Sequence, residues 1–137
     1  MVALLFFASA VGLVSHNPSP LCLTAERASE GVIFCAPRNV SFIFVGRTPS
    51  GKYSIYDYRY RFLPHPGGAK HGGQRLIVFQ GKRYVGNYML PPKVTVAVRG
   101  TQVVLKGDAD REAVRLDFSR GPPSRILVNG EVSAFHR

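Results

Sequence analysis

Hydrophobic and polar residues alternate in short runs along most of the chain, and such alternation predicts β-strands. The clearest run covers residues 53–62. One face of this strand would carry aromatic rings, Tyr56, Tyr58, Tyr60 and Phe62, and the other would carry charges, Asp57, Arg59 and Arg61. Similar runs predict strands at residues 32–35, 40–45, 75–80, 83–90, 94–98, 102–106, 113–119, 125–128 and 131–135. The chain is therefore expected to consist almost entirely of strands.

Turn-forming residues separate these runs at nearly regular spacing. Gly81-Lys82 and Asn129-Gly130 are signals for two-residue hairpins, and residues 63–74, with four glycines and two prolines, predict the one long loop. Strands joined by tight turns pair antiparallel. A meander of this length needs closure or a second layer to cover its edges. The expected fold class is all-β, a small antiparallel meander that forms a barrel or a two-sheet sandwich.

The N-terminal residues differ from the rest of the chain. Residues 2–14 are uncharged and apolar or small, and they are too few to span a bilayer as a helix. This pattern predicts a signal peptide over residues 1–15, with cleavage near Ala10 or Ser15. The alternative is a buried strand or helix of the mature domain. Residues 16–31 then form an N-terminal segment with one short helix, capped by Thr24 and ended by Gly31, and residues 32–137 form a single β domain.

Cys22 and Cys35 are the only cysteines, with twelve residues between them. In an oxidising compartment they are expected to pair. Such a bridge closes a loop of about 15 residues and contributes about 3 kcal/mol in the chain-entropy account. The alternative is a pair of buried thiols that act as small hydrophobes. Together with the predicted signal, the cysteines favour an exported protein of the periplasm or the extracellular space.

Charge adds a candidate binding surface. The net charge is +10, and residues 38–83 hold nine Lys/Arg against one acid, Asp57. The predicted binding residues are Lys52, Tyr56, Tyr58, Arg59, Tyr60, Arg61, Lys70, Arg75, Lys82 and Arg83. Interleaved rings and cations could form a platform for single-stranded nucleic acid. A tyrosine row that faces the core, with a solvated basic face opposite, produces the same alternation.

No set of catalytic residues stands out in the sequence. There is no Gly-x-Ser-x-Gly elbow, and His65 and His71 lie in a loop without a Cys, Asp or Glu that could complete a metal site. The two histidines carry the remaining enzyme alternative, as metal ligands or bases. We expect a chain that is not an enzyme and that needs no cofactor.

Two short stretches point to a known family. Gly81-Lys82-Arg83-Tyr84, followed by Arg99-Gly100 and Leu105, faintly resembles the Gly-x-Lys/Arg-Tyr and Lys-Gly-x-x-Ala-x-Leu stretches of the exported inhibitors of c-type lysozyme. The resemblance implies a small antiparallel β-barrel that binds an enzyme. Gln80 stands where that family has serine, Val103 stands where it has alanine, and the C-terminal cysteine is missing.

The leading hypothesis is a non-catalytic exported β-domain that binds an anionic surface or partner through its basic middle region. The expected partners are anionic lipid, lipopolysaccharide, polysaccharide or an acidic protein. The alternative is a protein-binding inhibitor or envelope assembly subunit that uses a strand edge or the loop at residues 63–74. Nucleic acid is a further alternative if the chain is not exported.

Overall fold

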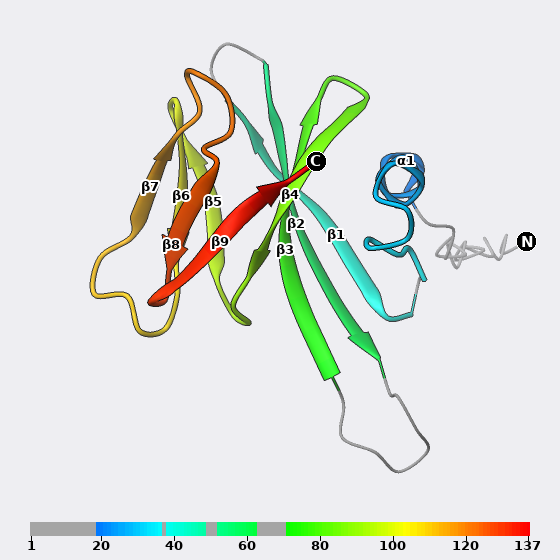
Figure 1. Ribbon diagram of the computed structural model, residues 1–137, viewed down its shortest axis with the longest axis horizontal. Coiled ribbons are helices and arrows are strands. Elements are labelled where there is room, and N and C mark those ends of the chain that lie inside the picture. Colours follow the sequence, from blue (N-terminus) through cyan, green and yellow to red (C-terminus); the bar gives the residue numbers. More distant parts are fainter. Residues whose placement is uncertain (1–18, 37, 49–51, 63–70) are drawn as a thin grey trace, which may run out of the picture.

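Two antiparallel sheets face each other across a hydrophobic core in the computed structural model, which describes residues 19–36, 38–48, 52–62 and 71–137 (Figure 1). The larger sheet has the order β1-β2-β3-β4-β9-β8, with bounds Val40–Arg47, Ser54–Phe62, His71–Gln80, Arg83–Leu90, Glu131–His136 and Arg125–Val128. The smaller sheet contains β5 (Thr95–Arg99), β6 (Gln102–Lys106) and β7 (Val114–Asp117). The predicted all-β meander is confirmed.

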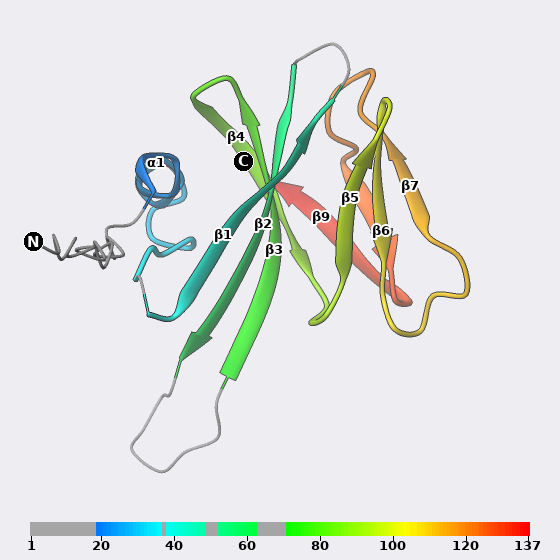
Figure 2. The ribbon, with the colours of Figure 1, turned by 180° about the vertical axis from the view of Figure 1, so that it is seen from behind.

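The two sheets approach each other on both sides, so the fold lies between a barrel and a sandwich. Figure 2 shows the end of β1 reaching the smaller sheet beside β5. Glycine permits this approach, because a Cβ added at Gly46 would lie only 2.9 Å from the Cβ of Val98. On the other side β7 lies next to β8. The strand pairing of the described residues does not continue across either junction.

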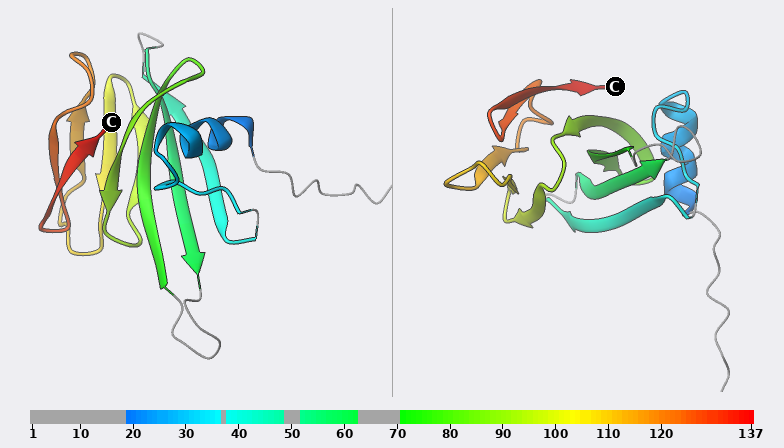
Figure 3. Two further views of the ribbon diagram at one scale, coloured as in Figure 1. Left: turned by 45° about the vertical axis from the view of Figure 1, so that its right-hand side comes forward. Right: turned by 90° about the horizontal axis from the view of Figure 1, so that it is seen from below.

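The row of tyrosines on β2 belongs to a second core on the outer face of the larger sheet. Helix α1 (Pro20–Ala28) lies across this face (Figure 3). Ala25 of the helix and Ile33 after it are fully buried against Tyr58, Ile77 and Phe79. Both faces of β2 are covered at its start, since Ile55 on the opposite face is buried in the core between the sheets, whereas Arg59 and Arg61 farther along that face are exposed.

The helix begins four residues earlier than predicted. Pro20 occupies the first helical position, where its fixed φ suits the helix and its missing N–H costs no hydrogen bond. Thr24, the predicted cap, lies inside the helix, and its hydroxyl donates to the carbonyl of Pro20 at 3.1 Å. The helix ends at Ala28, and Gly31 follows with φ +84°. The Ser-Pro pair is thus the true start signal.

The strand predicted at residues 32–35 is wrong. The backbone groups of Ile33, Phe34 and Cys35 bond to side chains, and Val32 N donates to the carbonyl of Ser29, so none of them pairs with a neighbouring strand. Ile33 N donates to Ser29 Oγ at 3.0 Å, Cys35 N donates to a carboxylate oxygen of Glu26 at 2.9 Å, and the hydroxyl of Tyr58 bonds both N–H and C=O of Phe34. The apolar residues form a connector that the Cys22–Cys35 disulfide ties to α1.

The long loop is also shorter than predicted, because β3 already begins at His71. Gly72 and Gly73 pair with Arg61 and Tyr60 of β2. The ring of Tyr60 occupies the place that a Cβ of Gly73 would need, so the glycine accommodates its cross-strand neighbour. Residues 63–70 lie outside the described part of the chain.

The predicted hairpins are confirmed. Gly81, the first central residue of its turn, has φ +61°. Asn129 and Gly130 have φ +54° and +77°, and a type I′ turn requires such positive values at both central positions. A bulge lies beside Gly86, since the β3–β4 register skips Val85. The predicted signal peptide lies outside the described residues. No helix in the described part of the chain has the length and apolar character needed to cross a bilayer.

Burial of two tyrosines predicts a loss of stability in alkali. Burial raises the pKa of Tyr58 to about 12 and also raises the pKa of Tyr88, because the phenolate form is disfavoured away from water. Stability is therefore constant below pH about 10, the unfolded value, and falls above it by up to about 1.4 kcal/mol per pH unit for each tyrosine. Urea unfolding between pH 8 and 11.5 measures this. Tyr58→Phe should make the decline less steep, and an unchanged slope would contradict the assignment.

Candidate functional site

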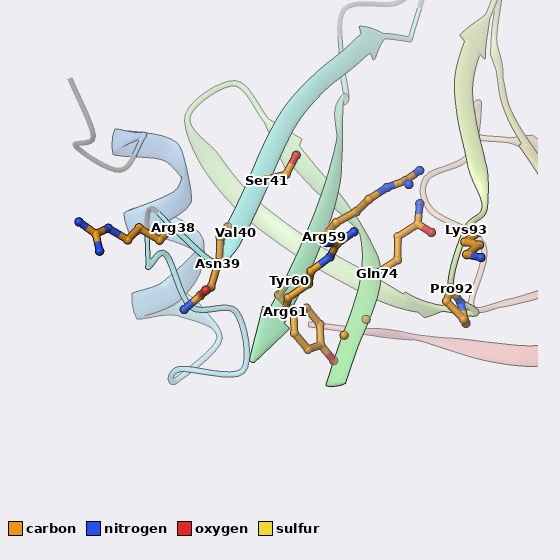
Figure 4. A pocket seen from close by; sticks show the side chains of 12 residues that line it. Arg38, Asn39, Val40, Ser41, Arg59, Tyr60, Arg61, Gln74, Pro92 and Lys93 are labelled. Atoms are coloured by element: carbon orange, nitrogen blue, oxygen red, sulfur yellow. The ribbon is translucent and has the colours of Figure 1, made fainter. Parts of the chain in front are cut away.

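A cleft of about 530 Å³ opens at the end of the larger sheet where β1 and β3 begin and β2 ends (Figure 4). Its remaining wall is the connection between β4 and β5. The lining residues are Arg38, Asn39, Val40, Ser41, Arg59, Tyr60, Arg61, Gly72, Gly73, Gln74, Pro92 and Lys93. Four of them are basic and exposed, and none is acidic.

Strand periodicity places two of the cations together. Arg59 and Arg61 are two residues apart on β2, so their side chains leave the same face of the strand. Figure 4 shows both side chains extending toward Gln74 and Lys93, whereas Arg38 points away on the other side of β1. Ser41 lies directly across from Arg59 in the β1–β2 pairing.

Arg59 is partly held by neighbours. Its Nε lies 3.2 Å from Oδ2 of Asp57, and one of its terminal nitrogens donates to the carbonyl of Val94 at 3.0 Å, while 48% of the side chain stays exposed. Across the described part of the chain, this is the only ion pair. The charges of Arg61, Lys93 and Arg38 therefore have no carboxylate within ion-pair distance among these residues, and the cleft keeps a positive potential.

Gln74 holds the opposite wall in place. This side chain is 2% exposed, and its amide makes two hydrogen bonds to the backbone of Val94. Val94 N donates to Oε1 at 2.8 Å, and Nε2 donates to the carbonyl of Val94 at 2.7 Å and to Asp57 Oδ1 at 2.9 Å. Gln74 thus joins β3 to the β4–β5 connection. It acts as a positioning residue for Lys93, which directly precedes Val94.

Lys93 itself has an unfavourable backbone. Its φ is +63°, in the left-handed region where a residue with a Cβ is disfavoured. The Gln74–Val94 hydrogen bonds after it and Pro92 before it hold this conformation. A strained residue that carries a charge at the rim of a cleft is a common feature of binding sites.

The structure brings only three of the ten predicted binding residues to this cleft. Arg59, Tyr60 and Arg61 line it. Lys52 lies at the opposite end of the larger sheet, because Ser54, two residues after it, pairs with Phe79 near the end of β3. Lys82 in the β3–β4 turn and Arg83 at the start of β4 lie at the same opposite end. Lys70 lies outside the described residues.

The other three predicted residues face the helix side of the sheet. Tyr58 is fully buried there, and Tyr56 stacks on Phe42 with ring centroids 4.5 Å apart. Arg75 is 9% exposed, its Nη1 donates to Asn87 Oδ1 at 2.9 Å, and its Nε is buried without a hydrogen-bond partner among the described residues. These rings serve packing, so the structure does not assemble the ring-and-cation platform on one face.

Several lining residues were missed by the sequence reasoning: Arg38, Asn39, Ser41, Gln74, Pro92 and Lys93. Ser41 could have been predicted by aligning the strands expected at residues 40–45 and 53–62 as an antiparallel hairpin, in which Ser41 lies across from Arg59. Lys93 has no local signal, since it reaches the cleft only through the path of the chain between the two sheets. Gln74 was assigned to a loop and is in fact a buried strand residue.

The basic side chains of the cleft are hydrogen-bond donors of the kind that bind anions. Guanidinium groups donate in a planar fork to carboxylate, sulfate or phosphate, and lysine adds a point charge. The described residues contain no group of three His, Cys, Asp or Glu side chains that could hold a metal ion. His65 and the side chain of His71 lie outside the described part, so the enzyme alternative stays a prediction.

Comparisons of this chain with protein-family models, with curated proteins and with solved structures find no match. The resemblance to lysozyme inhibitors gains no support from them. Any functional conclusion therefore follows from the geometry and charge of the cleft.

Proposed function

We propose that this chain is a non-catalytic binding protein that holds anionic groups in the cleft between β1, β2, β3 and the β4–β5 connection. One observation carries the proposal: three exposed cations, Arg59, Arg61 and Lys93, line one hollow whose lining contains no acidic residue. The net charge of +10 supports it, because a basic surface attracts anionic partners over distance and steers them toward the cleft.

The expected export of the chain supports the same function. The Cys22–Cys35 disulfide favours an oxidising environment. With the apolar residues 2–14, it supports export to the periplasm or the extracellular space, where anionic lipids and acidic polysaccharides are abundant partners. The alternative of a protein-binding inhibitor or assembly subunit depends mainly on the loop at residues 63–74, which is mostly outside the described residues, and stays a prediction.

Charge reversal in the cleft should weaken anion binding. We expect Arg61→Glu with Lys93→Glu to lower the affinity for heparin at least tenfold, because two unneutralised cations become repulsive. The matched control is Lys82→Glu with Arg83→Glu, which changes the net charge equally at the opposite end of the sheet. It should change the affinity far less. Isothermal titration at several salt concentrations measures both, and binding should weaken as salt rises.

A second variant separates binding from folding. Lys93→Gly removes the charge and the left-handed strain together, so stability should stay equal or rise by up to about 1 kcal/mol while affinity falls. If the Arg61→Glu, Lys93→Glu variant and the Lys82→Glu, Arg83→Glu control lose heparin affinity equally, the net charge of the surface and not the cleft binds the anion. Absence of binding to heparin, to anionic vesicles and to inorganic phosphate would overturn the proposed function.

A further inference from the structure

We infer that the cleft binds an acidic oligosaccharide, a sugar chain that carries sulfate or carboxylate groups, rather than a membrane surface. This inference rests on the proposed function and names the class of ligand for the same site. It depends on three properties of the cleft: its concave shape, its mixture of charged and neutral polar groups, and its open floor.

The concave shape argues against a flat anionic surface. Arg59 and Arg61 extend along the face of β2 toward a separate wall that carries Lys93. A bilayer plane would meet the cleft only along its rim, whereas a narrow chain can enter between the walls. Membrane-surface proteins also combine cations with exposed apolar side chains. The large exposed apolar residues lie outside the cleft lining: Val32, Ile43, Phe44, Met89, Leu127 and Val132.

Neutral polar residues also line the cleft. Ser41 pairs with Arg59 across the β1–β2 ladder, and Asn39 comes two residues before Ser41. Hydroxyl and amide groups both donate and accept hydrogen bonds. A sugar chain presents hydroxyls as well as acidic substituents, so it matches this mixture of neutral and charged groups. A single inorganic anion would use only the cations.

Glycine at the floor of the cleft leaves space for a sugar ring. Gly72 lies opposite Arg61, and a Cβ at this position would stand 2.9 Å from the backbone oxygen of Tyr60 and 3.5 Å from Cγ of Arg61, so only glycine fits there without a shift of β2. Without that carbon, a ligand can approach the backbone of β3 beside the guanidinium group. The cleft volume of about 530 Å³ lies within the usual range for sites that enclose small ligands, so the cleft fits a short oligosaccharide segment.

Heparin fragments of defined length test this inference on the full mature chain. We expect the affinity to rise from disaccharide to longer fragments, to level off once the cleft is filled, and to fall at least tenfold when the same fragments are desulfated. Phosphatidylglycerol vesicles and inorganic sulfate should bind more weakly at equal charge concentration. The Arg61→Glu, Lys93→Glu variant should lose the length dependence, and the Lys82→Glu, Arg83→Glu variant should keep it.

The outcomes separate the two proposals. Equal binding of fragments, vesicles and inorganic sulfate, without length dependence, would overturn the oligosaccharide inference and leave the anion-binding function intact. Stronger binding to vesicles than to fragments would identify a membrane ligand and also overturn the inference. If none of the anions binds, the proposed function fails together with the inference. Unfolding curves for each variant confirm that a lost affinity reflects the cleft and not misfolding.

Discussion

Replacement of Gln74 by leucine is expected to lower the free energy of unfolding by about 4 kcal/mol, although leucine has nearly the same volume. The loss comes from hydrogen bonds. Val94 is fully buried, and its N–H would lose its only described acceptor, while Asp57 would lose a donor. Each buried polar group left without a partner costs about 1–3 kcal/mol. Denaturant unfolding of the purified variant measures the effect.

Gln74→Glu gives a sharper version of the same test. The introduced carboxyl would lie beside Asp57, because Gln74 Nε2 is 2.9 Å from Oδ1 of that residue. Like charges raise the pKa of the introduced group. Stability should therefore resemble wild type below pH about 4, where the carboxyl still carries a proton to donate, and should fall as the pH rises through the raised pKa. A pH-independent loss would contradict this geometry. The leucine variant serves as the control, since it adds no ionisable group.

Removal of the disulfide is the second large effect. Cys22→Ser with Cys35→Ser should destabilise the fold by about 3 kcal/mol, as expected for a closed loop of this length. The loss should concentrate in α1 and the connector after it, because the bond joins these two segments over the tyrosine row. Hydrogen exchange of the amides of Ile33 and Cys35, which bond to Ser29 and Glu26, measures the local opening.

The cleft provides the control for this experiment. Arg59 and Gln74 bond to Val94 of the core between the sheets, on the face of the larger sheet away from α1, so anion affinity should change little in the double serine variant. Equal hydrogen exchange in the oxidised wild type and the variant would show that the helix stays docked without the bond. A large loss of anion affinity would show instead that the two cores are coupled through β2 and β3.

Local patterns in the sequence were sufficient for most of the fold. Alternation and turn chemistry act over neighbouring residues, so β2, the β3–β4 hairpin and the Asn129-Gly130 hairpin could all be predicted. Errors arose where tertiary contacts override local preference. Residues 32–35 look like a strand, but a disulfide and the hydroxyl of Tyr58 hold them as a connector. Gly72 and Gly73 look like a loop, but β2 and the ring of Tyr60 make them strand residues.

The candidate site likewise has one part that the sequence determined and another part that only the tertiary structure decided. The period of two along a strand determined that Arg59 and Arg61 share a face away from the tyrosines, and this could be read from the sequence alone. Only the tertiary structure decided that Lys82 and Arg83 lie at the far end of the sheet, that Arg75 is buried, and that Lys93 completes the cleft. These placements depend on strand register and on how the two sheets approach each other. Contacts between residues distant in sequence set both, so no local pattern encodes them.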